Sequence, residues 1–154
     1  MSSQVLTEQA LDAWKLYLLG HSALVGALNA DLVSGHGLTI NDYEVLLRLE
    51  QAPDQRMRRV DLAESVLLTA SGITRLLDGL ERDGYVERAQ CESDRRVTYA
   101  VLTDAGHDKL REAAGTHLRG VQERFAGRYS EEEIETLCEL LGRVGSGDAP
   151  DCTP

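Results

Sequence analysis

Apolar residues recur at spacings of three and four along the first third of the chain, as they do on one face of an α-helix. The first stripe predicts a long helix that begins after a Thr7 cap and ends at residues 34–37, where Ser and Gly interrupt the pattern. A second helix is predicted from Thr39, which has an acid, Asp42, three residues on, to residues 52–54, where Pro ends it. The first stripe contains Leu11, Trp14, Leu18, His21, Val25, Leu28 and Leu32, and the inner face of the second helix contains Tyr43, Leu46, Leu47 and Leu49.

Two closely spaced helices are predicted in the middle of the chain. The first is short, at about residues 58–66. The second begins after Thr69 and ends at Asp83-Gly84, because glycine tolerates the left-handed conformation found at helix ends. Core candidates are Val60, Leu62, Ala63 and Val66 in the short helix and Ile73, Leu76, Leu77 and Leu80 in the longer one.

The pattern then changes to the alternation that is typical of β-strands. Residues 85–88 alternate in polarity, residues 91–96 are polar and turn-prone, and residues 97–102 are rich in β-formers, which predicts a two-stranded hairpin with a long tip. Two helices follow, one capped by Thr103-Asp104 and one by Ser130, with Glu133 completing a capping box. Their inner faces are predicted to contain Leu110, Ala114, His117, Leu118, Val121 and Phe125, and then Ile134, Leu137, Cys138, Leu141 and Val144.

This order of elements predicts a mainly α fold with a small β-hairpin. The two central helices and their short joint form a helix-turn-helix candidate, and the hairpin follows as its wing. In such a motif the second helix enters the DNA major groove with its N-terminal part. Small residues there let the backbone approach DNA, hydroxyls can donate to phosphates or base edges, and an arginine can bind guanine or a phosphate. The outer face of this helix offers Ala70, Ser71, Gly72, Thr74, Arg75 and Asp78.

Composition narrows the class of protein. The 154 residues suit one domain, no apolar run approaches the roughly 20 residues of a membrane span, and the N-terminus lacks the features of a secretory signal. Three widely spaced cysteines predict neither a disulfide framework nor a CxxC metal site. We therefore expect a cytoplasmic protein without membrane, metal or cofactor. His21 and His117 lie on apolar stripes and are expected inside the fold, Cys138 in the core and Cys152 in a flexible tail at 146–154.

The charge is distributed unevenly. The chain has 16 basic and 26 acidic residues, a net charge of -10, which at first argues against a nucleic-acid partner. Between Arg56 and Arg96, however, eight arginines and eight acids balance, so the whole excess of acid lies outside this segment. An acidic protein could therefore still present arginines on one face of the fold.

Four motifs occur in order and at consistent spacing from the fourth predicted helix to the fifth. They are Thr74-Arg75-Leu76, then Leu80-Glu81-Arg82-Asp83-Gly84-Tyr85-Val86-Glu87-Arg88, then Asp94-Arg95-Arg96, then Leu102-Thr103-Asp104-Ala105-Gly106. Together they resemble the signature region of the MarR family of transcription regulators, and the resemblance covers about residues 5–145.

The resemblance implies a winged helix-turn-helix at about 36–102, flanked by dimerisation helices at 5–34 and 103–145, in a single unit of residues 1–145. Arg96 would lie at the wing and reach the minor groove, where narrow A/T-rich stretches attract arginine. Arg95 would contact a phosphate. Asp94 would orient the wing by pairing with an arginine and would not touch DNA. The alternative is that Asp94, Arg95 and Arg96 form only a solvated turn.

Further candidates lie outside the motifs. Thr39, Arg56, Arg58 and Arg59 are candidate phosphate contacts, or are only solvated. Trp14 and Tyr17 either line an effector cleft of the kind that binds aromatic acids and other small anions in this family, or pack in the dimer interface.

We expect a ligand-responsive repressor that binds double-stranded DNA as a homodimer on a palindromic operator. One alternative is a winged-helix module that binds protein and not DNA. Another is a redox-sensing regulator based on Cys91, whose pKa the neighbouring Arg95 could lower, although an incidental thiol is the favoured interpretation. An enzyme is not expected, because the sequence has no Ser/His/Asp set, phosphate loop or GxGxxG motif.

Overall fold

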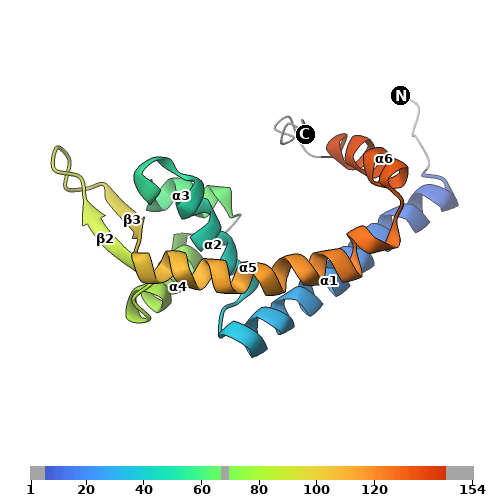
Figure 1. Cartoon of the computed structure of the whole chain (residues 1–154). Helices are drawn as coiled ribbons and strands as arrows, with labels where there is room; N and C mark the ends of the chain where they lie inside the picture. The colour runs from blue at the N-terminus through green and yellow to red at the C-terminus, as the bar shows by residue number, and fades with distance from the viewer. Residues whose placement is uncertain (1–5, 67–69, 145–154) are drawn as a thin grey trace, which may run out of the picture. The chain divides into compact units, whose positions relative to one another are not determined.

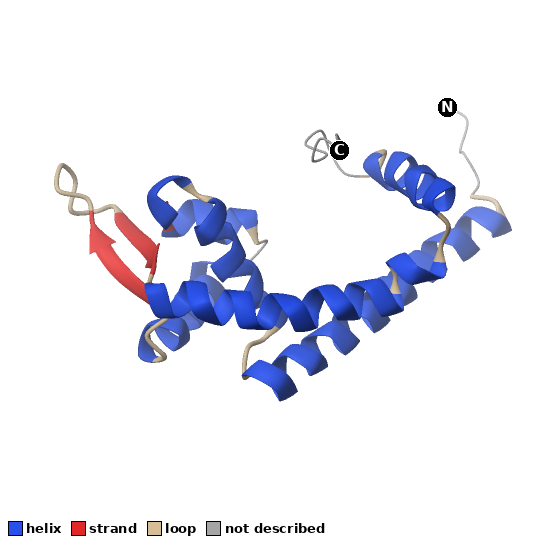
Figure 2. Cartoon of the chain, viewed as in Figure 1, coloured by secondary structure: helices blue, strands red, loops and turns tan. Residues whose placement is uncertain are grey.

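A computed structural model describes residues 6–66 and 70–144 (Figure 1). It confirms a mainly helical fold with a small antiparallel sheet (Figure 2). Thr69, the predicted cap of the fourth helix, lies outside the described residues, as do the side chain of Ala70 and the tail at 146–154 with Cys152. The elements are α1 (Glu8–His36), α2 (Ile40–Gln51), a 3-10 turn (Pro53–Gln55), β1 (Arg56–Arg58), α3 (Arg59–Ser65), α4 (Ala70–Arg82), β2 (Val86–Gln90), β3 (Thr98–Leu102), α5 (Asp104–Arg124), a second 3-10 turn (Ala126–Arg128) and α6 (Glu131–Gly142).

The sheet has three strands in the order β1-β3-β2, all antiparallel, so the predicted hairpin of β2 and β3 gains a third strand. Arg56 pairs with Val101 and Arg58 with Tyr99. The sequence pattern missed β1 because three residues cannot show a reliable alternation, and this strand is defined by its pairing with β3. The guanidinium of Arg56 also lies 4.6 Å from the centroid of the Tyr99 ring.

The core lies among α2, α3, α4, the sheet and the first turns of α5. Its fully buried side chains include Leu46, Leu49, Leu62 and Leu77, all at positions that the apolar spacing assigned to the inside. Val60 was expected in this core but is 64% exposed, because it is the second residue of α3 and faces away from Leu62. Burial of the leucines supplies most of the stabilisation, at about 1.5–3 kcal/mol for each side chain.

The helix ends confirm the predicted caps. Thr7 Oγ1 accepts from the Ala10 amide at 3.1 Å. Capping boxes form where they were expected, between Thr39 and Asp42 and between Ser130 and Glu133. Gly37 and Gly84 end their helices in the left-handed region, with φ of 68° and 80°.

The chain divides into two compact units inside α5, between His117 and Leu118. In the first unit, α1 contributes Leu28 and Leu32 to the core, whereas its N-terminal half is exposed. By length and composition alone, α1 is apolar enough to cross a membrane, and only 11% of its apolar window is buried. Apolar helices of proteins outside membranes pass the same test of length and average hydropathy, so the expectation of a protein without a membrane partner stays a prediction.

Several side chains expected inside the fold are exposed in this chain. His21 on α1 and Cys138 on α6 are both exposed. In the second unit, no described residue of α6 is buried. The spacing of these residues correctly predicts helices, but it cannot show which apolar stripe the chain itself covers. The exposed apolar side chains of the second unit include Leu118, Leu140, Leu141 and Val144.

Candidate nucleic-acid interface

The outer face of α4 presents the side chains that the sequence assigned to DNA. Ser71, Thr74 and Arg75 are exposed and Gly72 is half-buried, whereas Ile73 and residues 77 and 80 face the core. The face is fixed because these apolar positions, three and four apart, anchor one side of the helix. Arg75 has no ion pair within the described part of the chain and is therefore available to an anion.

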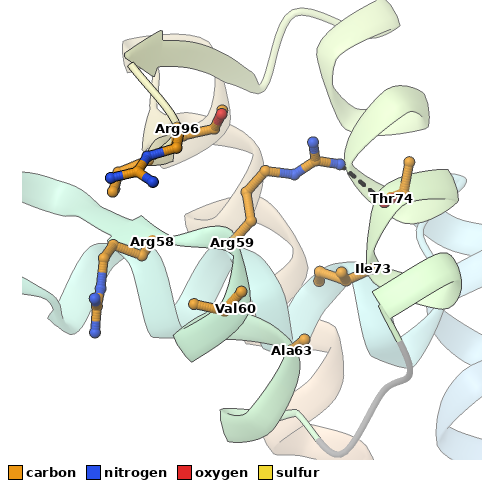
Figure 3. A pocket seen from close by; sticks show the side chains of 9 residues that line it. Arg58, Arg59, Val60, Ala63, Ile73, Thr74 and Arg96 are labelled. Atoms are coloured by element: carbon orange, nitrogen blue, oxygen red, sulfur yellow. Dashed lines mark hydrogen bonds between the residues drawn. The ribbon is translucent and has the colours of Figure 1, made fainter. Parts of the chain in front are cut away.

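Helix α3 supports this face through Arg59. Its Nη2 donates to Thr74 Oγ1 at 3.0 Å, so the first residue of α3 contacts the outer face of α4. Figure 3 shows the side chain of Arg59 extending across the space between the two helices toward Thr74. Arg58, beside it, is held by Asp61 through two hydrogen bonds of 2.7 and 3.0 Å.

The wing tip is the loop of residues 91–97 between β2 and β3. The Cys91 amide donates to the Val97 carbonyl at 3.0 Å, which closes the turn. Asp94 Oδ1 accepts from both the amide and the Nε of Arg96, at 3.0 and 3.2 Å. The hydrogen bond from the Arg96 side chain holds the pKa of Asp94 below its ordinary value. The Arg96 side chain is nevertheless 92% exposed, so its guanidinium is oriented by Asp94 and still accessible to a ligand.

Arg95 and Arg96 differ in their contacts. The side chain of Arg95 is exposed and has no ion pair within the described residues, whereas Arg96 pairs with Asp94. The predicted roles of Arg95, Arg96 and Asp94 at DNA are compatible with these positions and remain predictions.

A cluster of charges joins the wing to α4. Arg88, on β2, donates from Nε to Glu81 Oε1 at 2.5 Å and from Nη2 to Asp78 Oδ1. Both carboxylates lie on α4, and the hydrogen bond to Glu81 is the largest of the effects that raise the pKa of Arg88. Glu81 and Arg88 belong to one sequence motif, but the spacing within that motif does not predict that they pair. Opposite charges that flank the turn at Gly84 were the available signal.

The motif after the wing has a local explanation. Thr103 caps α5 by accepting from the Gly106 amide at 3.0 Å, and its hydroxyl donates to the Gly84 carbonyl at 2.7 Å. A Cβ on Gly106 would lie 2.1 Å from the Tyr85 carbonyl oxygen, so only glycine fits here. These contacts fix the start of α5 against the root of the wing.

A pocket of about 410 Å³ opens between α3, α4 and the wing. Its lining combines arginine side chains with an apolar wall, and it shares Thr74 and Arg96 with the candidate interface. Sequence spacing could not predict this pocket, because its lining residues come from three separate segments. The lining residues are Arg58, Arg59, Val60, Ala63, Ile73, Thr74, Arg96, Val97 and Thr98, seven of which Figure 3 labels.

The other predicted site residues lie apart from this pocket. Thr39 forms the capping box of α2, with its hydroxyl 2.8 Å from Asp42 Oδ2. Trp14 and Tyr17 stack on each other on α1 with ring centroids 6.2 Å apart, and both are about half exposed. Neither aromatic ring lines the pocket beside α4.

Cys91 has a different environment from the one expected. Its Sγ lies 3.1 Å from the Ser93 hydroxyl oxygen. That hydrogen bond, followed by those from the backbone amides of Asp94 and Ser93, lowers the pKa of the thiol. The expected cause, the charge of Arg95, is not among these effects, and the Asp94 carboxylate opposes them.

Comparison with known proteins agrees with this geometry. The MarR family model matches residues 38–98. The HTH-type transcriptional repressor YetL of Bacillus subtilis (strain 168) is 33% identical over 109 residues, which span 71% of this chain and 65% of YetL. AbsC, a MarR family transcriptional regulator from Streptomyces coelicolor, is 33% identical with a TM-score of 0.84, and the match covers 92% of this chain and 95% of AbsC. Sco3205, another MarR family regulator from Streptomyces coelicolor, solved in complex with DNA, is 29% identical with a TM-score of 0.89, covering 97% of this chain and 94% of Sco3205. The chain belongs to the MarR family of winged-helix transcriptional regulators.

Proposed function

We propose that the protein represses transcription by binding a palindromic operator in double-stranded DNA as a homodimer. The observation that carries this proposal is the exposed face of α4, with Ser71, Thr74 and Arg75, beside a wing that presents Arg96. Helix α4 would read bases in the major groove, and the wing would bind the adjacent minor groove. The name of the related repressor YetL and the DNA complex of Sco3205 support the assignment.

The homodimer is supported by apolar surface that a single chain leaves uncovered. Trp14 and Leu18 on α1 are about half exposed, and Leu16 and Leu19 are more so. Monomeric proteins rarely expose so many large apolar side chains on one helix. A second copy that covers α1 would place two α4 helices on one side of a duplex, and two-fold symmetry then requires a palindromic site.

The binding of DNA is best tested with a fragment of the protein's own promoter. We expect a shifted complex at low salt, and a footprint with two symmetric halves about one helical turn apart. The logarithm of the binding constant should fall linearly with the logarithm of salt concentration, by about 0.9 for each phosphate contact. Absence of a shift at low salt, together with capture of a defined protein partner, would favour the interaction module instead.

The ligand response is supported by the pocket beside α4. Guanidinium groups of Arg58, Arg59 and Arg96 and an apolar wall suit a small anion with an aromatic or aliphatic body. Because Thr74 and Arg96 belong to both the pocket and the interface, an occupant would compete with DNA. Benzoate should release operator in a concentration-dependent manner, while acetate, which lacks the apolar body, should be much weaker. Equal effects of the two salts would indicate ionic screening and would contradict a specific site.

A further inference from the structure

Helix α4 has a negative charge on the side that would face DNA. Asp78 lies three residues after Arg75 and four after Thr74, so these side chains share one face of the helix. Its side chain is 46% exposed. An unpaired carboxylate in this position would repel the phosphates that border the groove. The proposed DNA-binding face therefore requires that the charge of Asp78 be neutralised.

Arg88 is placed to neutralise it. The residue lies on β2, outside α4, yet its planar guanidinium donates to Asp78 through Nη2 and to Glu81 through Nε. Glu81 follows Asp78 by three residues, so the fork of the arginine spans one turn of the helix. With two of its nitrogens committed to carboxylates of its own chain, Arg88 differs from Arg75, which has no ion pair in the described residues.

Two further ion pairs, both between residues close in sequence, lie in the segment whose charges balance. Asp61 is held by Arg58, and Asp94 is held by Arg96. These two pairs neutralise one carboxylate beside the pocket and one at the wing tip. Unlike Arg88, which holds two carboxylates, Arg58 and Arg96 each hold one, and the Arg96 side chain stays 92% exposed.

We propose that Arg88 is a charge-masking residue, which supports DNA binding by cancelling the carboxylate of Asp78 and does not itself contact a phosphate. The proposal rests on the proposed DNA-binding function. Masking makes a distinct prediction, because the effect of removing Arg88 must depend on whether residue 78 is charged. If Arg88 instead contacted a phosphate, its removal would weaken DNA binding by the same factor whether residue 78 is charged or neutral.

A double-mutant cycle with Arg88→Gln, Asp78→Asn and their combination tests this dependence on operator DNA. We expect Arg88→Gln alone to weaken operator binding about tenfold, a size typical of coupled charges. Asp78→Asn alone should change binding by less than about twofold, because its charge is already cancelled. The operator affinity of the double variant should lie within about threefold of that of Asp78→Asn. Removing Arg88 would then matter much less when residue 78 is neutral. Arg111→Gln, an exposed arginine on α5, serves as a control for the loss of one positive charge.

Each outcome decides the proposal. Equal losses from Arg88→Gln in the two backgrounds would overturn masking in favour of a phosphate contact or a structural role through Glu81. Circular dichroism establishes that each variant is folded at the temperature of the assay. If Arg88→Gln does not fold, Asp78→Asn still decides, because a several-fold gain or loss of affinity in the otherwise unchanged protein would contradict a masked charge. Failure of the unmodified protein to bind operator would instead overturn the DNA-binding function, so the two failures are distinguishable.

Discussion

The winged region and the terminal helices use their apolar residues in opposite ways. Between α2 and the start of α5, large apolar side chains such as Leu46, Leu62 and Leu77 are buried within the chain. On α1 and in the second unit, side chains with the same spacing, such as Leu18 and Leu141, remain exposed. Hydrophobic periodicity therefore identifies helices in both regions. The exposed fractions show that the chain itself buries these apolar stripes in the winged region, whereas it leaves those of the terminal helices largely uncovered.

The polar contacts of the winged region and of the exposed half of α1 also differ. In the winged region, Arg59, Arg88 and Arg96 each bind a partner on another element or across a turn. In the exposed half of α1, Lys15 pairs with Asp12 at 3.9 Å, and these two residues are only three positions apart on the same helix. A region held by contacts between elements can present a rigid surface to DNA, and the exposed helices are suited to a second copy.

The largest expected effect comes from a charge on the exposed stripe of α1. Leu18→Glu should convert the proposed dimer to a monomer, because the carboxylate would be buried in an apolar interface without a partner. Operator affinity should fall by about a hundredfold or more, since two linked half-sites become one. Light scattering measures the mass and a gel shift measures the affinity.

Gln51→Glu is the matched control, because residue 51 is an exposed position of α2, outside the apolar surface of α1. It should leave both mass and affinity unchanged. A monomeric mass for the unmodified protein, with operator affinity retained by Leu18→Glu, would contradict the idea that the terminal helices need a partner.

Two glycines of α5 provide a comparison of packed and open positions. Gly106→Ala should lower the free energy of unfolding by about 3 kcal/mol, because its Cβ would overlap the Tyr85 carbonyl. Gly115→Ala meets nothing within 4 Å and should raise stability by up to about 1 kcal/mol, because alanine favours the helix. Urea denaturation measures both, and equal effects would show that the root of the wing yields to accommodate a methyl group.

The sequence predicted best what is decided locally. The capping box of Thr39 and Asp42 requires only residues three apart, and the inner face of α4 follows from one spacing rule. The outward position of Arg75 follows from the same rule. These features hold whatever the rest of the chain does, which is why they could be predicted.

Features that depend on distant residues were missed. Strand β1 exists because Arg56–Arg58 pairs with β3, and the pocket forms because Arg59 and Arg96 come from segments more than 30 residues apart. Cys138 was assigned to the core because its stripe is apolar, but the chain does not bury it. Spacing alone cannot tell a stripe that faces its own chain from one left for a partner.

Arg96→Ala should weaken operator binding by about 1–2 kcal/mol, if the wing contributes one groove contact. Asp94→Asn should have a smaller effect, because it removes only the group that directs the Arg96 side chain. Thermal unfolding should change little in either variant, since both side chains lie at an exposed tip. Quantitative gel shifts at fixed salt give the affinities, and an unchanged affinity for Arg96→Ala would remove the wing from the interface.

The smallest expected effect concerns His117, where the buried core ends. Its ring lies against Tyr43 with centroids 4.6 Å apart, and its Nδ1 is buried with no hydrogen-bond partner among the described residues. Burial lowers the pKa of His117 below the ordinary value of 6.5. Above pH 6.5 both folded and unfolded chains are neutral at this residue, but below it the unfolded chain takes up the proton first. The contribution of the neutral His117 ring to the free energy of unfolding is therefore complete at neutral pH. It is lost as the pH falls from 6.5 through the lowered pKa of the folded state.

His117→Phe keeps a ring against Tyr43 but cannot take up a proton. Between about pH 7.5 and pH 5, the melting temperature of this variant should fall by less than that of the unmodified protein. His21→Gln, at an exposed position of α1, should leave that loss intact, and an identical pH profile for His117→Phe would show that the core boundary does not sense protons through this ring.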